Sequence, residues 1–165
     1  MARIRVQTED FDAGAELAWL AAGRTDVGGI GCFVGTVRGG PVGGDVGGRT
    51  LAALVLEHYP AMTERALGQI VAEAERRWAL LGCTVIHRVG RLEPGANIVL
   101  VAAASAHRAD ALEATAFLID WLKTKAPFWK REEFADGGAA WVAARETDAA
   151  AAARWAEGAA AGHPD

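Results

Sequence analysis

Apolar and polar residues alternate over several short stretches of the chain, as they do in half-buried β-strands. These stretches are rich in β-branched or apolar residues and are bounded by glycine, proline or polar residues. The predicted strands are Ile4–Val6, Gly29–Arg38, Thr50–His58, Cys83–Val89, Asn97–Ala104 and Ala139–Arg145. A turn at Glu93–Gly95 joins the fourth strand to the fifth.

Apolar residues spaced three and four positions apart predict helices between these strands. The predicted helices are Glu16–Leu20 with an end near Gly23, Pro60 to about Leu81, Ser105–Lys125 and Asp148–Ala156. Gly82 is expected to cap the second helix, Ser105 to begin the third, and Pro127 to end it. Strands therefore come in adjacent pairs with a helix inserted between pairs. This order predicts an α+β fold with a mostly antiparallel sheet and helices packed on it.

The length of 165 residues suits one compact domain. We place that domain at residues 1–157 and expect residues 158–165 to fray. Residues 39–48 form a loop in which six of ten residues are glycine. Such a segment is expected to be mobile, either as a lid or as a loose hairpin connection.

The composition is 52% hydrophobic and 23% charged, which is typical of a globular protein and argues against disorder. A net charge of -4 speaks against a general nucleic-acid binder. The two cysteines, Cys32 and Cys83, lie in apolar runs and are predicted to be buried free thiols, which fits a reducing cytoplasm. The sequence shows no signal-peptide pattern and no apolar stretch of transmembrane length, so we predict a cytoplasmic protein without a membrane partner.

Within the segment Leu122–Arg131, the nine residues Lys123–Arg131 carry four cations in an otherwise acidic chain. Lys123 and Lys125 would also suit the negative end of a helix dipole, which is a purely structural role. The cations continue beyond Pro127, however, and apolar rings separate them. A lysine beside other cations and rings can have a lowered pKa and act as a base or nucleophile, or it can hold an anion.

Two further candidates lie elsewhere in the chain. His107 and Arg108 fall in the first turn of a predicted helix, where free backbone N–H groups and the dipole attract anions. Arg38 ends a strand beside the glycine-rich loop. His87 and His58 are interpreted as structural. The sequence shows no zinc-ligand spacing, phosphate-binding loop or nucleophile elbow, so no metal site is predicted. The residues indicate a lysine-rich site for an anionic small molecule and leave the reaction open.

Several strings taken together resemble the large, catalytic subunit of molybdopterin synthase, over about residues 3–155. The strings are Phe33–Arg38, Leu56–Glu64, Val85–Gly90, Ser105–Arg108 and Leu122–Glu132. The resemblance implies the α/β hammerhead fold of that family. It also implies conversion of cyclic pyranopterin monophosphate to molybdopterin. The sulfur comes from the C-terminal Gly-Gly thiocarboxylate of a small ubiquitin-like subunit.

The resemblance further implies a central homodimer with one small subunit at each end, a heterotetramer that needs no cofactor. It implies that Lys123 and Lys130 are the catalytic lysines. For Lys123 we favour a role as acid or base over a covalent role. The implied substrate contacts are Arg38, His107, Arg108, Arg145 from either protomer, Phe33 in the tail channel, and Lys125 as a charge only. Two alternatives stay open. One is a non-catalytic subunit that binds an anionic pterin or a protein tail, and the other is an assembly protein that binds only a carboxylate tail.

Overall fold

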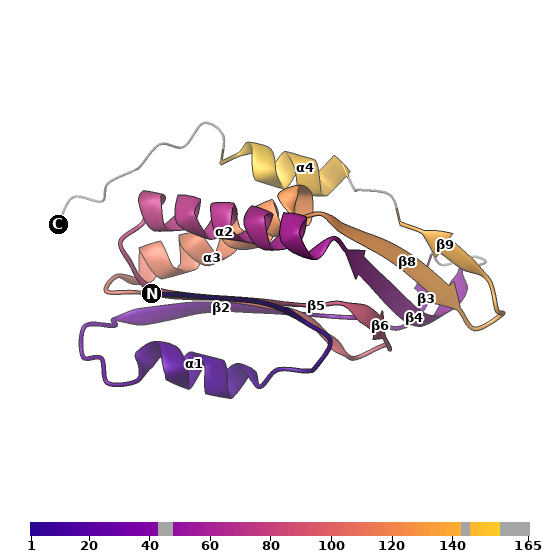
Figure 1. Ribbon diagram of the computed structural model, residues 1–165, viewed down its shortest axis with the longest axis horizontal. Coiled ribbons are helices and arrows are strands. Elements are labelled where there is room, and N and C mark those ends of the chain that lie inside the picture. Colours follow the sequence, from indigo (N-terminus) through magenta and orange to yellow (C-terminus); the bar gives the residue numbers. More distant parts are fainter. Residues whose placement is uncertain (43–47, 143–145, 156–165) are drawn as a thin grey trace.

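The computed structural model describes residues 1–42, 48–142 and 146–155 as a mixed α+β fold (Figure 1). The elements are β1 (Ala2–Gln7), α1 (Ala13–Ala21), β2 (Gly29–Thr36), β3 (Pro41–Val42), β4 (Arg49–His58), α2 (Pro60–Arg77), β5 (Leu80–Arg88), β6 (Gly90–Leu92), β7 (Asn97–Ser105), α3 (Arg108–Lys125), β8 (Phe128–Phe134), β9 (Ala139–Trp141) and α4 (Glu146–Ala153). The predicted fold class, α+β with mostly antiparallel strand pairs, is confirmed.

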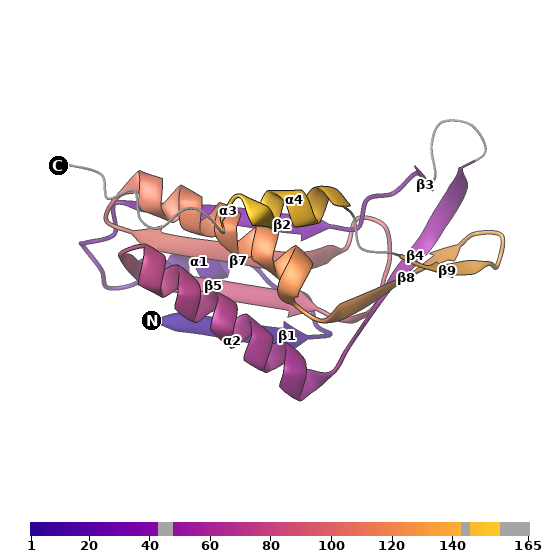
Figure 2. The same cartoon turned by 90° about the horizontal axis from the view of Figure 1, so that it is seen from above.

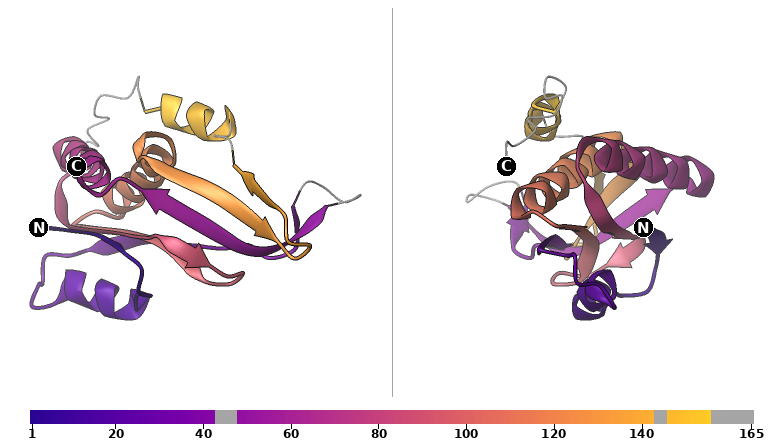
Figure 3. Two further views of the ribbon diagram at one scale, coloured as in Figure 1. Left: turned by 45° about the vertical axis from the view of Figure 1, so that its right-hand side comes forward. Right: turned by 90° about the vertical axis from the view of Figure 1, so that its left-hand side faces the viewer.

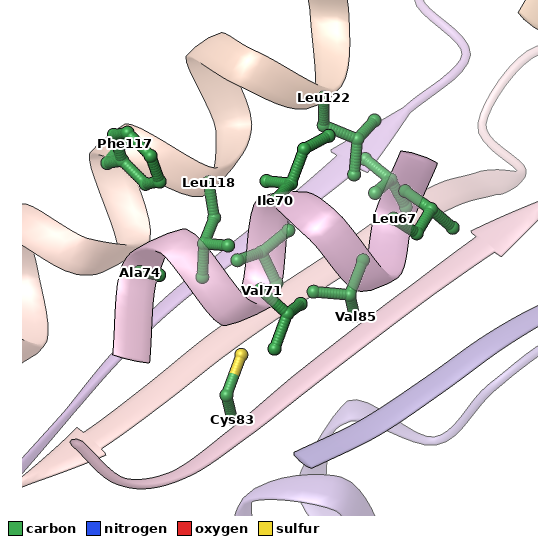
Figure 4. Packing of buried hydrophobic residues seen from close by; sticks show 11 residues of the cluster. Leu67, Ile70, Val71, Ala74, Cys83, Val85, Phe117, Leu118 and Leu122 are labelled. Carbon is green, nitrogen blue, oxygen red and sulfur yellow. The ribbon is translucent and has the colours of Figure 1, made fainter. Parts of the chain in front are cut away.

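The larger layer is a four-stranded sheet in the order β1-β5-β7-β2. Only β1 and β5 pair in parallel, while β5, β7 and β2 pair antiparallel. Helices α2 and α3 cover one face of this sheet and α1 covers the other (Figures 1 and 2). The main core lies between the sheet and α2 and α3, and Figure 4 shows its apolar side chains meeting there. Both faces are buried, as the almost continuous burial of β5 and β7 requires.

A second sheet, in the order β3-β4-β8-β9 with β6 also paired to β4, extends from one end of the first (Figure 3). In the β4–β8 pair, Leu56 lies opposite Lys130 and His58 opposite Phe128. A small core of Val37, Leu51, Leu56 and Leu92 joins the two sheets. The basic segment of the sequence therefore leaves the end of α3 and enters this second sheet.

The prediction differs from the structure at one helix end and at one strand. Helix α2 ends at Arg77 rather than near Leu81, and Gly82 lies inside β5 instead of capping the helix. The glycine is needed for packing, because a Cβ there would lie 2.9 Å from Leu20 of α1. Strand β8 was not predicted, since the charged residues between Phe128 and Phe134 hide the alternation.

Smaller differences concern caps, cysteines and the glycine-rich loop. Ser105 is the last residue of β7 and His107 is the N-cap of α3, although the Ser105 hydroxyl accepts the His107 N–H at 3.2 Å. Both cysteines are free, but Cys32 is exposed, so only Cys83 is buried as predicted. Pro41 and Val42 pair with β4 in a short hairpin. The remainder of the predicted loop (43–47) and the frayed tail (158–165) lie outside the described residues.

Within the described ranges, no helix combines the length and apolarity needed to cross a membrane.

Candidate active site

The register of the first sheet places Arg38 at the end that adjoins the second sheet. Gly35 of β2 pairs with Val99 of β7, and Val99 pairs with His87 of β5, so these residues form one row across the sheet. Arg38 follows Gly35 by three residues. The Val37 N–H donates to the carbonyl of Ala96 at 2.9 Å, which fixes the backbone beside Arg38. The Arg38 side chain is exposed at this end of the fold.

Helix α3 brings two lysines to the same end. A Cβ on Gly29 would lie 3.5 Å from Cα of Arg108, and one on Gly31 would lie 2.5 Å from the Thr115 hydroxyl. The N-terminal ends of α3 and β2 therefore lie side by side, and the two elements run in the same direction. Lys123, near the C-terminal end of α3, thus lies toward the end of the fold where Arg38 follows β2. The Lys123 side chain is 46% exposed, and its Nζ lies 3.9 Å from a carboxylate oxygen of Asp148 in α4.

Strand β8 supplies the third lysine from a different direction. Side chains alternate along a strand, so Lys130 lies on the same face of β8 as Phe128. The Phe128 ring stacks on the His87 ring, with centroids 3.7 Å apart and planes 13° apart. Lys130 is half-buried beside this stack.

His87 is a buried, neutral neighbour of Lys130. Its side chain is only 3% exposed, and Nδ1 lies 2.8 Å from the carbonyl oxygen of Arg88. Because a carbonyl oxygen can only accept, Nδ1 carries the proton in this bond. Burial, aided by the positive charge of Lys130, lowers the pKa of His87 to about 4. His87 therefore adds no charge near Lys130 at neutral pH, and the prediction of a satisfied structural histidine is confirmed.

His107 and Arg108 lie at the opposite end of the protomer. Sixteen residues separate His107 from Lys123, and a rise of 1.5 Å per residue puts them about 24 Å apart along α3. Both side chains are exposed. Within one protomer Arg38, Lys123, Lys125 and Lys130 thus belong to segments that reach the same end of the fold, whereas His107 and Arg108 lie at the other end of α3.

The other predicted site residues have separate positions. Phe33 lies midway along β2 and is 38% exposed. Arg131 lies on the opposite face of β8 from Lys130 and forms an ion pair with Glu133 at 3.2 Å. The prediction for Arg145 falls outside the described residues.

Sequence reasoning missed one signal that is visible in the chain. The protein has seventeen lysines and arginines, and the only lysines are Lys123, Lys125 and Lys130. Every other cation is an arginine, whose guanidinium stays charged, whereas a lysine amine can exchange a proton. The amines of the whole chain, apart from its N-terminus, are therefore gathered in this one region. Such a distribution indicates a chemical use for the amine beyond its charge.

Comparison with known proteins identifies the family. A family model described as "MoaE protein" matches residues 6–125. The chain belongs to the MoaE protein family. Among its relatives, the molybdopterin synthase catalytic subunit of Mesorhizobium japonicum is 54% identical over 153 residues, which cover 92% of each chain. The Escherichia coli protein of the same name is 50% identical, with 93% of this chain and 97% of the relative covered.

A solved MoaE protein from Burkholderia ambifaria superimposes on this chain with a TM-score of 0.76. Its sequence is 52% identical, and the match covers 94% of this chain and 99% of the other. The described residues of this MoaE-family chain contain no group of three or more histidine, cysteine or acidic residues that could hold a metal. The lysine-rich end offers amines, a guanidinium and the buried imidazole of His87.

Proposed function

We propose that this chain is the catalytic subunit of a molybdopterin synthase and works in the cytoplasm. It converts cyclic pyranopterin monophosphate to molybdopterin with sulfur from the C-terminal thiocarboxylate of a small ubiquitin-like subunit. The observation that carries the proposal is that Arg38, after β2, Lys123 of α3 and Lys130 of β8 all lie at one end of the fold. The family and the name shared by its relatives supply the substrate class.

The side chains at this end suit the steps of sulfur transfer. The thiocarboxylate sulfur attacks an activated pterin carbon and forms the new C–S bond. Water then cleaves the acyl–sulfur bond and returns the carrier as a carboxylate. Lys123 acts as the acid that protonates a leaving oxygen, and Lys130 stabilises the oxyanion of the acyl intermediate. Arg38 and Lys125 neutralise the substrate phosphate, and Phe33 lines the channel for the carrier tail.

His107 and Arg108 join this site from the second protomer of a homodimer. A separation of about 24 Å along α3 is too great for one small substrate to touch both groups in a single protomer. In a twofold-symmetric dimer with antiparallel α3 helices, the start of each α3 can lie beside the end of the other, so each copy can lend His107 and Arg108 to the site of its partner. Arg145 is assigned to the same anion-binding set.

Reconstitution with purified components tests the function. Wild-type protein, thiocarboxylated carrier and precursor should yield molybdopterin, while Lys123→Ala should abolish turnover and still bind the carrier tail. Arg76→Ala, which removes an exposed cation of α2 paired with Glu73, is the matched control and should retain full activity. Full activity in Lys123→Ala would refute the catalytic assignment and leave a binding subunit as the better description.

A lysine-to-arginine variant separates proton transfer from charge. Lys123→Arg keeps a cation at the site but replaces the amine with a guanidinium, which is a much weaker proton donor. If Lys123 is an acid, this variant should bind substrate and carrier as the wild type does and should lose kcat. If charge alone matters, Lys123→Arg should retain most of kcat.

A further inference from the structure

Helix α4 lies over α3 and is fixed there by Trp155, which follows the helix (Figures 1 and 2). The Trp155 ring packs edge-on against the rings of Trp78 and Phe117, with centroids 5.8 and 5.6 Å apart. Its indole N–H donates to a carboxylate oxygen of Asp120 in α3 at 2.8 Å. Its carbonyl oxygen accepts from the guanidinium of Arg77 in α2, also at 2.8 Å. The C-terminal end of α4 is therefore anchored to both helices of the main core.

The N-terminal end of α4 brings a carboxylate to Lys123. Asp148 is the third residue of α4, and one of its carboxylate oxygens lies 3.9 Å from Nζ of Lys123. Along α3, Lys123 follows Asp120 by about one turn, whereas Asp148 precedes Trp155 by about two turns. The two helices thus run antiparallel, and the anchor at Trp155 determines where the Asp148 carboxylate lies.

The amine of Lys123 needs a restraint of this kind. It ends a flexible four-carbon stem, and 46% of the side chain is exposed. Arg38, Lys125 and Lys130 add positive charges at the same end of the fold, and like charges push an unrestrained ammonium toward solvent. A general acid works only within hydrogen-bond distance of the atom that it protonates. Free movement of this amine would therefore lower the rate.

We propose that Asp148 is the positioning residue for Lys123, and that α4 holds its carboxylate where it confines the amine to the reacting part of the site. Asp148 acts only through Lys123 and touches no substrate. An ammonium has three N–H donors, so one directed at Asp148 leaves two for the substrate. The inference rests on the proposed function for the role of Lys123 and adds the group that orients it.

A purely structural role for Asp148 has different consequences. A carboxylate in the first turn of a helix also suits the positive end of the helix dipole. That role alone predicts a less stable protein after its removal, with unchanged turnover by the folded molecules. The positioning role predicts the reverse. An exposed ion pair adds little to stability, whereas a misplaced catalytic group costs up to about 100-fold in rate.

Steady-state kinetics of Asp148→Asn separate these two roles. Asparagine keeps the size of the side chain and removes its charge, so kcat should fall roughly 10- to 100-fold. The KM for the precursor, the Kd for the carrier and the urea midpoint should not change. Asp148→Glu restores a carboxylate and should recover most of the lost kcat.

Asp136→Asn is the matched control, because it removes the carboxylate of another exposed ion pair, with Arg49 at 2.5 Å, in the turn after β8. This control should keep the wild-type kcat. A wild-type kcat in Asp148→Asn would overturn the proposal. Tighter binding of the carrier together with faster turnover in Asp148→Asn would also overturn it, because Asp148 would then compete with the carrier for Lys123.

A zero-length carbodiimide cross-link tests the contact without kinetics. The reagent joins an amine to a carboxylate that lies against it. Peptide mapping of the wild-type protein should find Lys123 joined to Asp148, and Asp148→Asn should abolish this link. A wild-type protein without the link would overturn the proposed contact, whatever the rates.

Failure of this inference can be distinguished from failure of the proposed function. If the wild type makes molybdopterin and Asp148→Asn makes it equally fast, the positioning role is refuted and the function stands. If the wild type forms the cross-link but yields no molybdopterin, the function is refuted, and the positioning role with it, while the contact remains.

Discussion

Heterodimers that carry different inactivating changes on their two chains would reveal whether each site is shared between protomers. The perturbation is the pair Lys123→Ala and Arg108→Ala. In one protomer these residues lie at opposite ends of α3, fifteen residues and therefore about 22 Å apart along its axis. If both contribute to one reaction, they must come from different chains.

The expected magnitude follows from counting sites. When one chain carries Lys123→Ala and the other Arg108→Ala, one of the two shared sites has both changes and the other has neither. This trans heterodimer should therefore have about half of the wild-type kcat, although both parent homodimers are inactive. When both changes are on one chain and its partner is wild type, every shared site lacks one group. This cis heterodimer should be inactive.

Two different affinity tags and sequential purification would yield each heterodimer free of homodimers, and molybdopterin formation would be assayed with saturating carrier. Sites contained within single protomers predict the opposite pattern, with the trans heterodimer inactive and the cis heterodimer half active. That reversed pattern would refute the shared site whatever the absolute rates.

Three stability predictions and one binding prediction follow from other described features. Phe117→Ala should lower the free energy of unfolding by about 3–5 kcal/mol in urea titrations, because the ring is fully buried against three tryptophans. An unchanged midpoint would contradict that packing. The lowered pKa of His87 means that the unfolded chain binds more protons than the folded protein between pH 6.5 and about 4. Stability should therefore fall as the pH drops through this range, by at most about 3 kcal/mol, and His87→Phe should reduce this fall. Gly31→Ala should destabilise by about 1–3 kcal/mol, because its Cβ would meet Thr115 at 2.5 Å. Gly68→Ala, with open space around it in α2, should instead stabilise by roughly 0.5–1 kcal/mol, and equal midpoints would argue against the close approach of α3 to β2. Binding of the carrier tail should weaken with added salt, which calorimetry at two ionic strengths would measure, and a salt-independent Kd would count against a charged tail site.

Local patterns in the sequence predicted most helices and strands. They failed where contacts with distant residues determine the local structure. Gly82 looks like a helix cap by sequence, but the structure uses it to admit Leu20 of α1. Strand β8 has charges at every position between Trp129 and Phe134, so only its pairing with β4 makes it a strand. In both cases the deciding contact comes from a distant part of the chain.

The site shows the same division. Clustering along the chain was enough to find Lys123, Lys125 and Lys130, because α3 and β8 keep them at one end. The sequence also predicts that His107 and Lys123 belong to the same helix. Whether their side chains can reach one substrate depends on the distance between them along that helix. The position of His87 beside Lys130 depends on its stacking with Phe128. These two residues lie about forty positions apart in the chain, so no local pattern predicts the contact.

The parallel pairing of β1 with β5 has a consequence for synthesis of the chain. Ala2 pairs with Cys83, so β1 is synthesised about 80 residues before its partner β5 and must wait roughly 4–16 s for it at usual translation rates. During that interval Arg3 and Arg5 alternate with the apolar residues of β1 and can both bind Glu16 of the neighbouring α1. Charges placed between apolar residues of a strand disfavour its aggregation while its partner strand is absent.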